Sequence, residues 1–335
     1  EAWWWPKYNQ IDNVGIENMT LTSGPSPHLI SFTATQNSWV KGNTLVNANR
    51  SHVAVEYSRG IEIRENKITK HANVASDAYG VRITMAGDTL VEDNVFDTLA
   101  NAVGTQSSTG NVISYNYILN MVYSAPGWLP ETIMTHGGHS YMNLFEGNIM
   151  PNFYFDDIHG SGSHNVIFRN RAFGWQADRN GTNSAIPIQY EYWNKYQSAI
   201  GNVLGKQGFH TSYGSIYSVD KLPQSGTFNG TTVTMEPLSS SNEGASTLIR
   251  WANWDTGTNG VRYNTSELPS GMSTPSQTLP TSLYLSAKPA FFGASTLAWP
   301  SIEPTAATLS NSDTFFTNPA KYCYDQGKMP GCLLP

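Results

Sequence analysis

Acidic and imidazole side chains are concentrated in two short segments near the middle of the chain, and one further acid follows later. Two carboxyl groups held a few ångströms apart can cleave a glycosidic bond, one acting as proton donor. A second carboxyl group nearby raises the pKa of the first, which suits that donor. We therefore predict glycosidic hydrolysis, with His136 and His159 as supporting groups. The predicted catalytic carboxyls are Glu131, Asp156, Asp157 and Glu191.

Two other interpretations of these segments remain open. The His-Gly and Gly-Ser-Gly sequences could simply bend the chain, with His136 and His159 stacked and bonded to backbone carbonyls. A metal site could instead be built from Asp157 and four histidines, although His-x-x-His on a loop is a weak zinc signal. Those histidines are His136, His139, His159 and His164. We predict no cofactor, and no motif indicates a calcium site.

Aromatic residues lie in the same part of the chain. Flat rings suit the apolar faces of sugars, but they could equally anchor long loops. The predicted substrate-binding residues are Trp128, Trp175, Tyr190, Trp193, His139, His164 and Arg169. A polysaccharide lyase would need a base and a cation that neutralises a uronate. Candidate arginines are Arg82, Arg169, Arg171 and Arg179, where Arg169 and Arg171 could be solvated edge residues. No basic cluster stands out, so hydrolysis of a neutral glycan is favoured.

The candidate residues belong to a repeat built around asparagine. An apolar pair, two mostly polar residues, an Asn and a further apolar residue recur 22 to 32 residues apart, as from 94 to 116 and from 116 to 148. The repeated residues are Asn18, Asn43, Asn66, Asn94, Asn116, Asn148, Asn170 and Asn202. Apolar and polar residues alternate around each Asn, which indicates strands, and no helix signals intervene. Each repeat is therefore predicted to form a coil of two or three strands, stacked at about 4.8 Å on the previous one.

The repeated asparagines have a physical role in such a stack. They are predicted to sit at bends, where residues that tolerate a left-handed backbone are favoured, and to bond one another from coil to coil. This ladder, over about residues 10–210, resembles the right-handed parallel β-helix proteins of the pectate-lyase-like superfamily. The resemblance implies an all-β solenoid. That superfamily includes lyases, hydrolases, esterases, tailspikes and non-catalytic surface proteins, so it implies no single activity.

Coil stacking predicts which candidate residues meet. His136 and His159 are about one coil apart and should be vertical neighbours, Glu131 and Asp156 could also stack, and Glu191 lies a coil further on. The long spacings, 116 to 148 and 170 to 202, predict loop insertions that wall a lateral groove. We divide the chain into β-helix coils over 1–220, irregular or further coils over 221–275, and an extended tail over 276–335 that packs on the solenoid.

Composition limits the function classes. The chain has 335 residues, 13% of them charged, and a net charge of −6, which argues against nucleic-acid binding. No apolar stretch is long enough to span a membrane. Cys323 and Cys332 either form a disulfide that holds the C-terminal tail in place, which implies an oxidising compartment, or remain two free thiols. We favour the disulfide and predict a secreted or cell-surface protein whose partner is a polysaccharide.

The N-terminal end of the solenoid has no obvious cap. A ladder coil begins by residue 14, so a partner chain, a missing segment or Trp3–Trp5 is expected to cover that end. The alternative function is therefore a non-catalytic surface or fibre component that assembles through its solenoid ends.

Overall fold

The structure is a computed structural model. It describes residues 10–22, 24, 26–125, 127–181, 184–221, 226–228, 231–233, 243–293 and 297–332. The expected cap at Trp3–Trp5 lies outside these residues.

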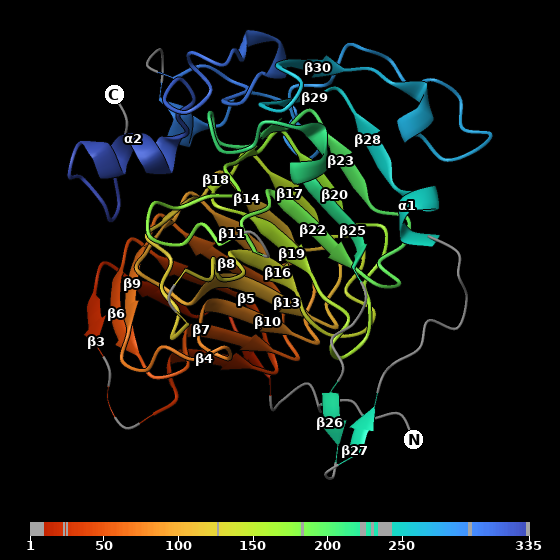
Figure 1. Cartoon of the computed structure of the whole chain (residues 1–335). Helices are drawn as coiled ribbons and strands as arrows, with labels where there is room; N and C mark the ends of the chain where they lie inside the picture. Colours follow the sequence, from red (N-terminus) through yellow and green to blue (C-terminus); the bar gives the residue numbers. More distant parts are fainter. Residues whose placement is uncertain are drawn as a thin grey trace.

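Three parallel sheets run side by side along a solenoid, as predicted (Figure 1). Sheet A contains β1 (Ile11–Asp12), β2 (Gly15–Glu17), β5 (Thr35–Lys41), β8 (Arg59–Arg64), β11 (Leu90–Glu92), β14 (Val112–Ser114), β17 (Leu144–Glu146), β20 (Val166–Phe168), β23 (Ser198–Ile200) and β28 (Ile249–Trp251). Sheet B contains β3 (Thr20–Thr22), β6 (Thr44–Ala48), β9 (Lys67–His71), β12 (Val95–Asp97), β15 (Tyr117–Leu119), β18 (Ile149–Met150), β21 (Arg171–Ala172), β24 (Val203–Leu204), β29 (Asn253–Asp255) and the antiparallel β30 (Gly260–Arg262). Sheet C contains β4 (His28–Thr33), β7 (Ser51–Glu56), β10 (Tyr79–Thr84), β13 (Asn101–Gln106), β16 (Ile133–Thr135), β19 (Phe153–Phe155), β22 (Ile188–Glu191) and β25 (Tyr217–Lys221).

Each coil passes through sheet C, then sheet A, then sheet B, as in β7, β8 and β9. The side chains that alternate inward along the strands, such as Val53, Ile63 and Ile68, form one continuous apolar core. A short hairpin, β26 (Gly226–Phe228) and β27 (Thr231–Val233), and α1 (Glu243–Thr247) separate β25 from β28. The fold is therefore the predicted all-β parallel β-helix.

The asparagine ladder lies between sheets A and B, inside the solenoid. Each side-chain amide donates to the Oδ1 of the Asn one coil on, for example from Asn148 to Asn170 at 2.9 Å. The ladder continues to Asn253, which the sequence did not single out. Two details of the prediction were wrong. Asn18 is not a member, because Met19 holds that position and donates its backbone N–H to Asn43. In each coil the residue with a left-handed backbone at this bend is the one before the ladder position. Asn18 is such a residue, because it precedes Met19.

The C-terminal tail packs along sheets A and B and is held by buried polar groups (Figure 1). Arg169 donates to the carbonyls of Pro280 and Ile302 and pairs with Glu303. Arg171 donates to Ser312 O and pairs with Asp313. Both arginines are buried, so the idea that they are solvated edge residues was wrong.

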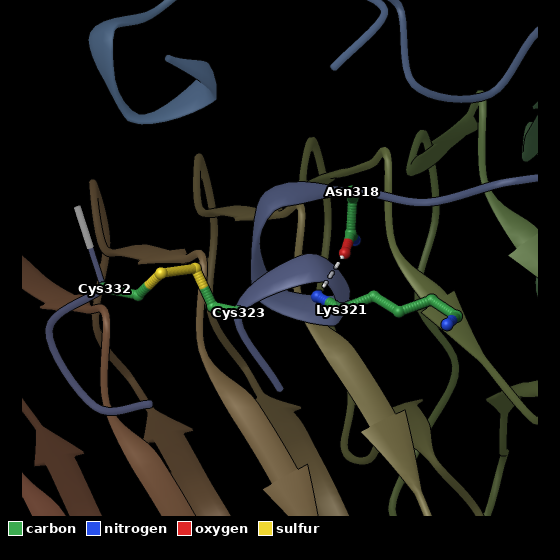
Figure 2. The surroundings of a disulfide bond; sticks show 4 residues. All are labelled: Asn318, Lys321, Cys323 and Cys332. Carbon is green, nitrogen blue, oxygen red and sulfur yellow. Dashed lines mark hydrogen bonds between the residues drawn. A yellow bond between two sulfur atoms is a disulfide. The ribbon is translucent and has the colours of Figure 1, made fainter. Parts of the chain in front are cut away.

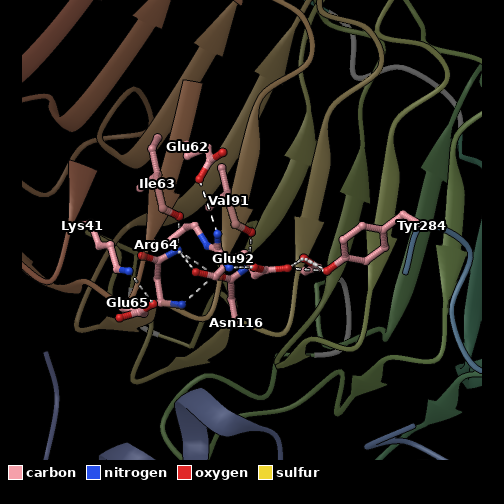
Figure 3. Close-up of polar contacts among 11 residues, drawn as sticks. Lys41, Glu62, Ile63, Arg64, Glu65, Val91, Glu92, Asn116 and Tyr284 are labelled. Carbon is pink, nitrogen blue, oxygen red and sulfur yellow. Dashed lines mark hydrogen bonds and ion pairs between the residues drawn. The ribbon is translucent and has the colours of Figure 1, made fainter. Parts of the chain in front are cut away.

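An acidic contact joins the tail to sheet A. Figure 3 shows Glu92 between Arg64 and Tyr284. Burial raises the pKa of Glu92, and this effect is partly offset by Arg64 and the Tyr284 hydroxyl, which lower that pKa. Short 3-10 turns occur in this part of the chain at Thr265–Glu267, Ala290–Phe292 and Pro304–Ala306, and earlier at Tyr213–Ser215.

The last helix, α2 (Pro319–Asp325), contains Cys323, which forms the predicted disulfide with Cys332 (Figure 2). The Asn318 side chain caps this helix by accepting the backbone N–H of Lys321, and its amide reaches the carbonyls of Asn116 and Gly147. Within the described residues, no helix has the length and apolarity to cross a membrane.

Candidate active site

Three outward side chains form a row across sheet C. The register pairs Thr135 with Phe155 and Phe155 with Tyr190. The next residues are His136, Asp156 and Glu191, which therefore lie side by side on successive coils. The alternation of a strand turns all three outward, because the preceding residue points into the core.

His136 and Asp156 form a hydrogen-bonded pair. His136 Nδ1 lies 2.5 Å from Asp156 Oδ2, and the Asp156 side chain is fully buried. The second Asp156 oxygen accepts the backbone N–H of Ile158. The His159 ring meets His136 edge-on, with centroids 4.6 Å apart, so these two histidines are neighbours as predicted. The register places Asp156 beside His136, which corrects the expectation that Asp156 stacks on Glu131.

Asp157 and Glu191 lie close enough that each carboxyl group affects the pKa of the other. Burial raises the pKa of Glu191 to about 7, and the charges of Asp157 and Asp156 add to this effect. Burial is also the main cause of the raised pKa of Asp157. Glu191 therefore keeps its proton to a higher pH than an ordinary carboxyl group does, which suits a proton donor.

Tyr154 is a member of this group that the sequence analysis missed. Its hydroxyl donates to Glu191 Oε1, and its ring packs with Tyr79 and Met134. A Cβ at Gly104 would lie 2.6 Å from the Tyr79 ring, so only glycine leaves room for this packing. Strand alternation could have found Tyr154, because it is the outward residue between the core residues Phe153 and Phe155.

Glu131 precedes β16 and lies near the same group. Its charge, like that of Asp156, acts on both Tyr79 and Tyr154 and raises the pKa of each, although burial is the larger cause. The fold thus brings three predicted carboxyls and both supporting histidines to the carboxyl ends of the sheet C strands, whereas Glu131 lies before the start of β16.

Two long loops from sheet B to sheet C border these coils, where the insertions were predicted. Residues 120–132 and 173–187 pack on one another through Gln176, which both donates to and accepts from Met121, and through Gly181, which bonds Gly127. Arg179 donates to carbonyls of the first loop. Trp128 and Trp175 belong to these loops, and both are half-buried.

The remaining predicted binding residues are scattered. Tyr190 points into the core, where it packs on Phe155 and is 1% exposed, so it offers no surface to a ligand, which corrects its predicted role. Trp193 is 36% exposed, and His139 and His164 are exposed on turns from sheet C to sheet A. Arg169 lies under the tail. Among the described residues, no group of three or more His, Cys, Asp or Glu side chains is arranged to hold a metal ion.

Comparisons with known proteins agree with this architecture. A family model described as "Right handed beta helix region" matches residues 7–127. The protein is a right-handed parallel β-helix. No curated protein sequence matches the chain.

Solved structures with a similar fold include DFA-IIIase from Arthrobacter chlorophenolicus A6 in complex with GF2, at 10% identity and a TM-score of 0.41, over 78% of this chain and 60% of that one. The same protein without its lid gives 11% identity and a TM-score of 0.40, over 62% and 58% of the two chains. The chain spans about 60% of the length of these structures.

Proposed function

We propose that this β-helix is a secreted or cell-surface enzyme that hydrolyses glycosidic bonds in a polysaccharide. The observation that carries the proposal is the buried Glu191 carboxyl, bonded by Tyr154, beside the hydrogen-bonded Asp156–His136 pair. The raised pKa of Glu191 suits a proton donor, and the Asp156–His136 pair presents an oriented imidazole. A proton donor and a proton acceptor on neighbouring coils are what glycoside hydrolysis needs.

The reaction assigns one role to each pair. Glu191 gives its proton to the glycosidic oxygen as the bond from that oxygen to the anomeric carbon breaks. A water molecule bonds to the anomeric carbon and loses a proton to His136. Asp156 holds the imidazole by Nδ1 and stabilises the imidazolium that forms. The proton on His136 then returns to Glu191 through solvent, which restores the starting state.

The surroundings favour an uncharged, hydroxyl-rich substrate. Charged residues make up only 13% of the chain, and exposed rings such as Trp193 lie beside the site. Flat rings of this kind cover the apolar faces of sugars. The Cys323–Cys332 disulfide supports an oxidising compartment, where polysaccharides are met outside the cell.

The test is a panel of neutral and acidic polysaccharides assayed for new reducing ends and, separately, for ultraviolet-absorbing unsaturated products. We expect reducing ends without unsaturation from the wild type and a loss of at least about a hundredfold in Glu191→Gln. Glu62→Gln, on the outer face of sheet A, is the matched control. Unsaturated products would show a lyase, and an unaffected Glu191→Gln would contradict the proposed acid.

A second candidate function rests on the first described coil. Ile11 and Met19 are each 52% exposed there, and β1, β3 and β4 are the first strands of their sheets. An exposed apolar end with open strand edges suits docking of a further chain segment or partner. Light scattering of the wild type and of Ile11→Ser with Met19→Asn tests this: the candidate predicts an oligomer that the double variant loses, and a monomeric wild type contradicts self-assembly.

A further inference from the structure

One turn position between sheets C and A has the same backbone conformation in seven successive coils. Bridges from Arg59 through Gly87, Thr109, Tyr141 and Ser163 to Lys195 align the coils at the preceding residue. The position itself has φ between 48° and 67° throughout. It is occupied in chain order by Asn37, Gly60, Asp88, Gly110, Met142, His164 and Tyr196.

The residue types at this turn position change abruptly from the early coils to the later ones. The first four are Asn, Gly, Asp and Gly, which are the residues that adopt a left-handed backbone most readily. The last three are Met142, His164 and Tyr196; His adopts this conformation fairly readily, whereas it is less favourable for Met and Tyr. Burial does not explain this choice, because Met142 is 64% exposed, Tyr196 is 53% exposed, and His164 is exposed as well.

Met142, His164 and Tyr196 belong to the coils that carry the candidate site. Met142 follows His136, His164 follows Asp156, and Tyr196 follows Glu191, each within the same turn from sheet C to sheet A. The rings of His164 and Tyr196 are stacked, with centroids 5.0 Å apart and planes 21° from parallel. The nearest cation, Lys195, is already paired with Glu243. A stacked pair of exposed rings and an exposed thioether therefore lie on the turns that follow the acid–base groups in the same coils.

We propose that Met142, His164 and Tyr196 form a platform on which sugar rings of the substrate stack while the chain is cleaved at Glu191. This inference rests on the proposed function for its substrate and adds three residues that bind it. A platform of rings and a thioether, rather than of charges, selects a neutral glycan presenting apolar ring faces. All three side chains are exposed, so they are available to contact the ligand.

The test uses changes with different expected effects on stability and on binding. Replacing Tyr196 by Asn relieves backbone strain, so Tm should rise by about 1–2 °C. Replacing His164 by Asn exchanges two residues that both tolerate this backbone, so Tm should change by less than about 1 °C. The same variants should weaken glycan binding by about fivefold, seen as a raised KM on the polysaccharide that the panel identifies. Tyr57→Asn is the matched control. Tyr57 is exposed and left-handed (φ 51°) but lies in an early coil, so its variant should gain stability and keep its KM.

Each outcome decides between the two proposals. Unchanged KM in both platform variants overturns the platform while leaving the proposed hydrolysis intact. If no polysaccharide is cleaved, retardation in gels containing each polysaccharide of the panel replaces KM. Loss of retardation in Tyr196→Asn and His164→Asn would then support a binding platform although hydrolysis had failed. A fall in Tm with unchanged binding would show a structural role, and no retardation of the wild type would overturn the platform.

Discussion

The Glu191 carboxyl at the end of β22 accepts a hydrogen bond from the Tyr154 hydroxyl of β19, one coil earlier. The two residues are 37 positions apart in the chain and meet because β19 and β22 are paired in register. Burial raises the pKa of Glu191 to about 7, and the negative charge of the neighbouring Asp157 adds to this effect. Glu191 therefore behaves as an acid that keeps its proton to a higher pH than an ordinary carboxyl group.

Tyr154 should set the protonation of that acid. Its hydroxyl donates to Glu191 and stabilises the ionised carboxylate, which keeps the pKa of Glu191 from rising further. Tyr154→Phe should therefore move the basic limb of the pH–rate profile to higher pH and lower the maximal rate. Met134→Leu, a change in the same apolar group, should leave that limb in place. If the basic limb of the pH–rate profile of Tyr154→Phe stays at the wild-type position, Tyr154 contributes packing and does not set the pKa of Glu191.

Asp156 should matter to catalysis through His136. Asp156→Asn removes the charge that pairs with His136 Nδ1 and can present an amide N–H in place of the acceptor. We expect kcat to fall by about 10²–10⁴-fold with little change in KM. Circular dichroism and Tm establish that the variant is folded. A folded Asp156→Asn with near wild-type kcat would remove His136 from the mechanism.

Sequence reasoning reached the fold and most members of the site, but not their pairing. The Asn ladder is readable because its amide chemistry repeats in every coil, and only its first position was misassigned. Which acid meets which imidazole depends on strand register. Residues that lie side by side on β16 and β19, such as His136 and Asp156, are 20 positions apart in the chain. The sequence spacing had suggested neighbours 23 to 25 positions apart. The short B-to-C connection between β18 and β19 absorbs the difference. Tyr190 was misplaced for a related reason, since a one-residue shift exchanges the inner and outer faces of a strand.

Arg171 should be a main anchor of the C-terminal tail. Burial lowers its pKa to about 9, so it stays protonated at neutral pH. It bonds Ser312 O, Gly205 O and Asp313. Arg171→Met leaves these acceptors unsatisfied and should lower the free energy of unfolding by about 3 kcal/mol in urea titration. Arg59→Gln, which breaks an exposed ion pair with Asp88, should cost under about 1 kcal/mol. Equal effects from the two variants would contradict the anchoring role.

Two buried histidines should make the fold acid-sensitive. Burial lowers the pKa of His52 to about 3 and that of His71 to about 4. Between those values and 6.5 the unfolded chain binds protons that the folded chain excludes, so stability falls as the pH falls. The slope is about 1.4 kcal/mol per pH unit for each histidine. His52→Met should make that slope shallower, and His139→Asn, at an exposed site, should not.

Glu191 contributes to the same titration with the opposite sign. Its folded pKa is raised, so between 4.5 and about 7 the folded chain binds the extra proton, and stability increases as the pH falls. The histidine slopes are therefore best measured in a Glu191→Gln background. In that background, a slope unchanged by His52→Met would show that His52 does not titrate as argued.

The pH–rate profile of glycan hydrolysis, measured for the wild type, Glu191→Gln and Asp157→Asn, decides whether Glu191 is the proton donor. We predict that the wild-type rate declines as the pH rises through about 7, where Glu191 loses its proton. Glu191→Gln should be nearly inactive at every pH. Asp157→Asn removes a negative charge beside Glu191 and should move the decline to lower pH. A wild-type rate that does not decline near pH 7, or a Glu191→Gln variant that hydrolyses at the wild-type rate, would contradict the assignment of Glu191 as the proton donor.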